Sequence, residues 1–162
     1  MSIIEWQFAD EPVSEDYVEK IGNDLGFKLP KDYISCVAIN NGANVEPELS
    51  NVGNREKVFG TLLSYDKDND EFIVDVYNSY RGTLPNGLVP FAFDPAGNLI
   101  CFDYKDHEDS PIVVFWEHEN AGEKEMLMLE DGLTETEAEE RARENVFYVA
   151  ATFTEFLDKL HD

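Results

Sequence analysis

The chain has 162 residues and carries 12 lysine or arginine residues against 35 aspartate or glutamate residues, which gives a formal net charge of −23. Its length is typical of one domain with a buried core, and its hydrophobic fraction of 43 % argues against a disordered chain. The charge argues against nucleic acid and anionic membranes as direct partners and favours basic proteins, although acidity that only confers solubility is the alternative.

The N-terminal region predicts a short strand followed by a helix. Residues 3–8 have the composition of a strand. Ser14 is typical of a helix start, and apolar residues then recur at three- and four-residue spacing as far as Leu25. Gly26 is the expected stop, because glycine readily adopts the left-handed conformation that ends helices.

A second helix and an exposed loop are expected next. Residues 30–39 begin with a proline, which suits a first helical turn, and the Asn-Asn-Gly of residues 40–42 is expected to end the helix. Residues 43–56 hold Asn, Pro, Gly and Glu but few large apolar residues, so they are predicted to form an exposed loop. Residues 58–63 have the composition of a strand.

An acidic stretch, residues 66–71, then resembles part of a calcium loop. Its aspartates occupy the first, third and fifth positions, but Glu71 and Tyr77 stand where an EF-hand loop needs a glycine and a bidentate glutamate. We therefore interpret the stretch as a solvated acidic loop. Apolar residues return at helical spacing over residues 73–80, and Gly82 is the expected stop of that helix.

The following region predicts most of a sheet. Residues 88–93 and 99–104 are apolar runs on either side of residues 94–98, whose proline and glycine favour a hairpin turn. Residues 112–116 are entirely apolar, which is typical of a strand at the centre of a sheet. Residues 126–129 are a further candidate strand.

The C-terminal region predicts two helices with an apolar segment between them. Residues 134–137 fit a capping box and open a charged, solvated helix that extends to about Glu144. Residues 146–150 are apolar, and their type is left open. A second capping box at residues 152–155 opens a final helix. Because helices come first, then mostly strands, and then a helix, the order indicates an α+β fold.

The sequence contains no motif for a metal, a cofactor or a catalytic nucleophile. His107, His118 and His161 lack the spacing of a zinc site, and neither a nucleophile elbow nor a glycine-rich phosphate loop is present. We therefore expect no metal, no cofactor and no enzyme activity. The alternative is an enzyme with an unrecognised carboxylate site, since 35 acids allow many pairs.

The sequence also predicts a cytoplasmic protein. Cys36 and Cys101 lie in apolar stretches, where we expect reduced, buried thiols rather than a disulfide framework. No run of about 18 apolar residues indicates a membrane span, and residues 1–10 lack the basic and apolar regions of a signal peptide.

Several segments, taken in order, resemble a known family. Residues 25–33 and 40–42 resemble the N-terminal signature of the SUKH superfamily, and residues 90–103 look like its central hairpin. Residues 112–118 are similar to the strand that follows the hairpin, and residues 148–157 are similar to the closing helix of the family.

This resemblance implies one SUKH-like domain over residues 1–162, with a curved, mostly antiparallel sheet and helices packed around it. Segments near residues 43–56 and 122–143 depart from the family pattern and are expected to be variable or inserted. Bacterial members are similar to immunity proteins that neutralise a cognate polymorphic toxin, often a nuclease. Eukaryotic relatives resemble regulatory and scaffolding proteins, so a non-enzymatic regulatory domain is the alternative.

The expected partner is a toxin with a basic surface, and formation of homo-oligomers stays open. We predict that two acidic loops and their neighbouring tyrosines form the toxin-binding site. The choice rests on charge and on position in expected loops. The residues are Tyr65, Asp66, Asp68, Asp70, Glu71, Tyr80, Tyr104, Asp106, Glu108 and Asp109.

Overall fold

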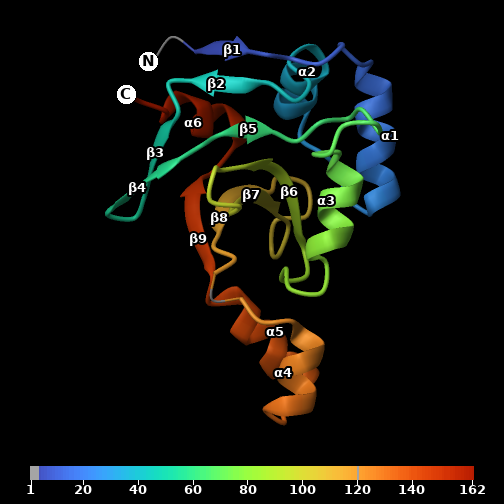
Figure 1. Ribbon diagram of the computed structural model, residues 1–162, viewed down its shortest axis with the longest axis vertical. Helices are drawn as coiled ribbons and strands as arrows, with labels where there is room; N and C mark the ends of the chain where they lie inside the picture. Colours follow the sequence, from blue (N-terminus) through green and yellow to red (C-terminus); the bar gives the residue numbers. More distant parts are fainter. Residues whose placement is uncertain (1–3, 120) are drawn as a thin grey trace.

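The computed structural model describes residues 4–119 and 121–162, and within these residues the chain forms six helices and nine strands. Seven strands form one antiparallel sheet, and two more form a separate hairpin (Figure 1). Along the sheet the order is β1 (Glu5–Gln7), β2 (Asn44–Glu46), β5 (Thr61–Leu62), β6 (Leu88–Phe93), β7 (Leu99–Asp103), β8 (Ile112–Trp116) and β9 (Val146–Ala150). The hairpin strands are β3 (Leu49–Val52) and β4 (Arg55–Val58). The predicted α+β class is confirmed.

The helices begin and end largely where local sequence signals predict. They are α1 (Glu15–Leu25), α2 (Lys31–Ile39), α3 (Ile73–Tyr80), α4 (Lys124–Glu130), α5 (Glu135–Arg143) and α6 (Phe153–Asp158). The Ser14 hydroxyl accepts a hydrogen bond from the Tyr17 amide, and Gly26 ends α1 with a φ of 94°. Thr134 and Glu137 form the complete capping box of α5. These caps satisfy backbone groups that a helix end leaves unpaired.

One face of the sheet carries an aromatic core against α2 and α6. Side chains alternate along a strand, so Phe102 of β7 points to this face together with Phe91 of β6. The two rings stack with centroids 4.3 Å apart. Tyr33 from α2 and Phe153 from α6 meet both rings at steeper angles. These contacts join elements that are up to 120 residues apart in sequence.

The opposite face carries a second buried cluster, and α5 is attached to this face by an ion pair. Leu99, Cys101 and Val114 are buried there with Trp116, whose ring meets that of Tyr80 at the end of α3. Asp103 also faces this side, where the Arg143 guanidinium of α5 donates to both of its carboxylate oxygens, at 2.6 and 3.2 Å. This ion pair fixes α5 to the sheet, and Figure 1 shows α4 and α5 extending away from the sheet at the lower end of the view.

The prediction of an exposed loop over residues 43–56 is wrong. The segment contains β2, β3 and the start of β4, and Val45 and Val52 are buried. These strands have three or four residues each, and more of their residues are polar than apolar, so their composition resembles that of a loop. The strand expected at residues 58–63 is divided between the end of β4 and β5. The strand expected at residues 3–8 is shorter, and Ile3 lies outside the described residues.

Two further strand predictions need correction. Residues 126–129 lie in helix α4, because an apolar run of four residues does not distinguish a strand from a helix. The strand at residues 112–116 is β8, as expected, but it is second from the edge and not central. Its side chains are apolar because both faces of the sheet are covered. The segment whose type was left open, residues 146–150, is the edge strand β9.

Candidate interaction surface

The two predicted acidic loops leave the same end of the sheet. β5 and β7 both run antiparallel to β6, so they point in the same direction. The loop after each of these strands therefore begins at the same end of the sheet. Asp66, Asp68, Asp70 and Glu71 after β5, and Asp106, Glu108 and Asp109 after β7, are all exposed. The fold therefore brings the two predicted loops to one end, with a single strand between them.

Internal hydrogen bonds shape the first of these loops. The Asp66 carboxylate accepts from the Asp68 amide at 2.9 Å, and the Asn69 side chain accepts from the Glu71 amide at 2.8 Å. Asp10, which lies before α1, accepts from the Asn69 amide group and from the Ser64 hydroxyl, both at 2.8 Å. One loop carboxylate is thus used in a turn, whereas the outer carboxylates remain free to face a partner in solvent.

Tyr65 does not lie at the surface, which corrects its predicted role as an anchor. Its side chain is 1 % exposed, and its hydroxyl is 2.6 Å from the hydroxyl of Tyr33. Its amide donates to the buried side chain of Asn41 at 2.7 Å. Burial raises the pKa of both phenols, so both hydroxyls stay protonated. The sequence predicts Asn41 only as part of a helix end, and no local signal indicates this contact over 24 residues.

The other two predicted tyrosines are half-buried, Tyr104 at the start of the second loop and Tyr80 at the end of α3. Tyr104 donates its hydroxyl proton to the Lys28 carbonyl at 2.7 Å, and its ring lies 5.1 Å from that of Phe27. Desolvation by burial raises the pKa of Tyr104. Tyr80 rests on Trp116 with ring centroids 5.6 Å apart. Each of these rings therefore keeps a fixed orientation and an accessible edge.

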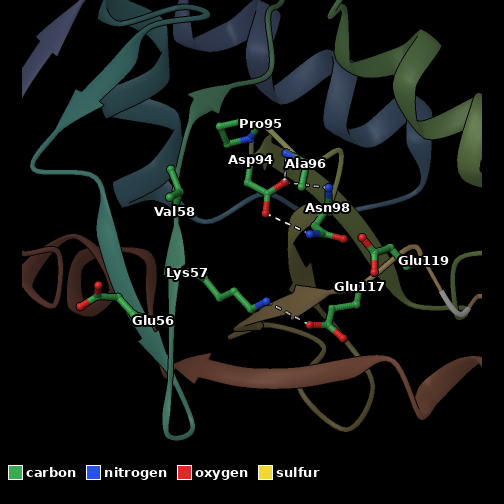
Figure 2. A pocket seen from close by; sticks show the side chains of 9 residues that line it. All are labelled: Glu56, Lys57, Val58, Asp94, Pro95, Ala96, Asn98, Glu117 and Glu119. Atoms are coloured by element: carbon green, nitrogen blue, oxygen red, sulfur yellow. Dashed lines mark hydrogen bonds and ion pairs between the residues drawn. The ribbon is translucent and has the colours of Figure 1, made fainter.

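A polar cleft lies apart from these loops, between the β3–β4 hairpin and the β6–β7 turn. It has a volume of about 310 Å³, and its walls are Glu56–Val58, Asp94–Ala96, Asn98, Glu117 and Glu119 (Figure 2). The Glu117 carboxylate pairs with Arg55 at 2.9 Å and with Lys57 at 3.2 Å. The charges on this side of the cleft therefore largely neutralise each other.

The polar groups of this cleft form the hairpin turn. One Asp94 oxygen accepts from the amides of Ala96 and Asn98, and the other accepts from the Asn98 side chain, at 2.8 to 3.0 Å. The His118 ring lies 2.8 Å from the Ala96 carbonyl and also contacts the turn. With its oxygens occupied in this way, Asp94 shapes the turn and is a poor candidate for an acid–base group.

The expected burial of the cysteines holds for Cys101 and only in part for Cys36. Both are free, and Cys101 is fully buried whereas Cys36 is half-buried. Desolvation raises the pKa of Cys36 to about 11 and also raises that of Cys101, so neither forms a reactive thiolate near neutral pH. Throughout residues 4–119 and 121–162, no group of three or more His, Cys, Asp or Glu side chains is placed to hold a metal ion.

The geometry defines an α+β domain with one seven-stranded antiparallel sheet and a separate two-stranded hairpin. The sequence model of the SMI1 / KNR4 family (SUKH-1) matches residues 12–159, and the chain belongs to this family. The resemblance to the SUKH superfamily is thereby confirmed. A comparison with curated proteins found no match. None of the helices in the described part of the chain is long and apolar enough to cross a membrane.

Proposed function

We propose that the chain is an immunity protein that binds a cognate toxin domain and blocks its basic active site with an acidic surface. Two observations support the proposal. The chain belongs to the SUKH-1 family, whose superfamily includes such inhibitors, and its acids outnumber its bases by 35 to 12. The excess of exposed carboxylates is the observation that carries the choice of partner.

Few cations in the described structure are free to mask these carboxylates. Seven of the twelve lysine and arginine side chains already form ion pairs with acids of the same chain. The formal net charge of −23 therefore gives the molecule a negative field on average. Such a field steers cationic partners and raises association rates, up to ~10⁸–10⁹ M⁻¹s⁻¹ at low salt.

A nuclease is the toxin class that this charge fits best. A nuclease must offer cationic groups to phosphates, and an acidic inhibitor competes for the same groups. The acidic loops at residues 66–71 and 106–109 follow β5 and β7, which run in the same direction. The half-buried ring of Tyr104 lies at the start of the second loop, and Tyr80 lines a pocket together with Glu71 of the first. We propose that these loops contact the toxin, whereas buried Tyr65 supports them from within the core.

Titration calorimetry at low and high salt tests the function. The probe is the C-terminal domain of the protein encoded by the neighbouring gene, tested as the toxin domain and added to the full chain. We expect nanomolar binding that weakens as salt rises, together with survival of cells that express both proteins. Absence of binding at both salt concentrations would contradict the immunity role and favour a regulatory or scaffolding domain.

A further inference from the structure

Helix α4 presents apolar side chains to solvent. Leu129 is 79 % exposed, and Met126 and Met128 are 44 % and 38 % exposed. None of the seven residues of α4, all of which the structure describes, is buried. Met126 and Leu129 are three positions apart and share one side of the helix. An exposed Met and Leu cluster of this kind is typical of an adaptable binding surface.

Charged and polar contacts hold α4 against α5 and the segment at residues 82–86. Lys124 pairs with Glu139 of α5 at 3.2 Å and donates to the Asn86 side chain at 3.1 Å. Glu139 also accepts from the Asn86 amide. The ion pair of Arg143 with Asp103 attaches α5 to the sheet. The α4–α5 hairpin therefore presents the apolar face of α4 in a fixed position. A surface that is ordered before binding loses less entropy when a partner docks.

A cleft beside α4 combines apolar and acidic walls. It has a volume of about 400 Å³ and lies between α4, α5 and the segment at residues 82–86. Met128 and Ala138 contribute apolar surface, and Glu123, Glu125 and Glu135 contribute carboxylates. Lys124 and Glu139 also line the cleft, where they pair with each other. A long side chain with an apolar stem and a cationic head, as in lysine or arginine, matches these walls.

The charge around α4 indicates the chemistry of the partner. Residues 121–144 contain nine acidic and three basic residues. All three bases are used inside the molecule, because Lys124, Arg141 and Arg143 pair with Glu139, Glu144 and Asp103. The exposed acids would repel a second copy of this hairpin and anionic lipids, and they attract a basic protein.

We propose that α4 and its cleft form a docking surface for a basic protein with an apolar patch ringed by lysine and arginine. We call this the α4 surface and define it by Met126, Met128, Leu129, Glu123, Glu125 and Glu135. The inference deepens the proposed function, and it rests on that function only for the identity of the partner as a toxin.

The first test uses a defined probe and the full chain. A synthetic peptide of alternating lysine and leucine is titrated into ¹⁵N-labelled protein, in parallel with a lysine–serine peptide of equal charge. We expect the leucine peptide to shift amide resonances of α4 and α5 and to bind about tenfold more tightly than the serine peptide. Shifts confined to other elements, or equal affinity of the two peptides, would overturn the inference.

Matched variants make the test specific. The triple variant M126S/M128S/L129S should lower affinity for the leucine peptide about tenfold. The control I39S removes another exposed apolar side chain, 68 % exposed and located on α2, and should leave affinity unchanged. Because all four side chains lie at the surface, the unfolding midpoint should stay near that of the wild-type protein, and thermal unfolding checks this.

The toxin domain separates this inference from the proposed function. If wild-type protein binds the toxin domain and the triple variant binds it equally well, the α4 surface is overturned while the immunity role stands. If wild-type protein ignores the toxin domain but the leucine peptide still shifts α4, the immunity role fails and the α4 surface stands. A dimer in solution that Leu129→Ser dissociates would instead identify a second copy as the occupant and overturn the inference.

Discussion

The acidic loop at residues 66–71 and the α4–α5 hairpin carry the same sign of charge but differ in what lies beside it. The loop places exposed carboxylates above the buried pair of Tyr33 and Tyr65, and part of its polar groups maintain its own turns. The hairpin surrounds exposed methionine and leucine side chains with acids. Charge alone accelerates encounter, whereas apolar contact slows dissociation. The loop is therefore suited to speeding the association of a basic partner, and the α4–α5 hairpin is suited to slowing its dissociation.

The largest effect is expected when the α4–α5 hairpin loses its attachment to the sheet. Arg143→Met removes the cation from the buried Asp103 carboxylate, which is 7 % exposed in the native ion pair. We expect a loss of about 3 kcal/mol in the free energy of unfolding, because an uncompensated buried charge is costly. Urea denaturation measures it. The double variant D103N/R143M should recover part of the loss, and a change below about 1 kcal/mol in the single variant would contradict this role of the pair.

A smaller effect is expected beneath the acidic loop. Tyr65→Phe deletes one hydroxyl of the buried pair and leaves the Tyr33 hydroxyl without its partner. The free energy of unfolding should fall by about 1–2 kcal/mol, while affinity for a basic partner stays unchanged. Denaturation and calorimetry on the same sample test both statements. A selective loss of affinity with unchanged stability would restore Tyr65 as a contact residue.

The capping box of α5 is predicted to stabilise the α4–α5 hairpin independently of the sheet. Thr134→Ala removes the hydroxyl that accepts from the Glu137 amide at 3.1 Å. We expect a loss of about 1 kcal/mol, and Thr134→Ser should retain most of the stability. Amide hydrogen exchange should report faster opening of α4 and α5 with little change in β7. Uniformly faster exchange across the sheet would show that the hairpin and the sheet open together.

The smallest change in stability is expected from the charges of the loop. Asp68→Lys combined with Asp70→Lys alters exposed side chains, so the free energy of unfolding should change by less than about 0.5 kcal/mol. Association with the toxin domain should slow and depend less on salt, whereas dissociation should change little. Stopped-flow kinetics measures both rates. Unchanged association would remove this loop from the interface.

Local signals predicted the parts of the fold that depend on neighbouring residues. Ser14 and Gly26 bound α1, and the proline and glycine of residues 94–98 turn the central hairpin, as their backbone preferences require. The wrong predictions concern segments whose secondary structure depends on residues that are distant in sequence. Val45 makes a strand only because β1 and β5 flank it, and the apolar run of α4 is helical without burying any residue.

The candidate site was predictable in its charge but not in its full extent. Exposed acids at residues 66–71 and 106–109 follow from composition, and the sheet order then places both loops at one end. Burial of Tyr65 depends on Tyr33 and Asn41, which no spacing in the sequence connects to it. The α4 surface also escaped the sequence analysis, because its apolar residues were assigned to a strand and not to an exposed helix.

The place of α6 in the aromatic core has a consequence for biosynthesis. Phe153 and Phe156 pack against Phe91, which the ribosome makes about sixty residues earlier. Until α6 has left the ribosome, the rings of β6 and β7 lack part of their cover, and exposed apolar surface of this kind promotes aggregation. The core is thus complete only after residues 153–156 have been synthesised, and chaperones that shield aromatic surface are most useful before that point.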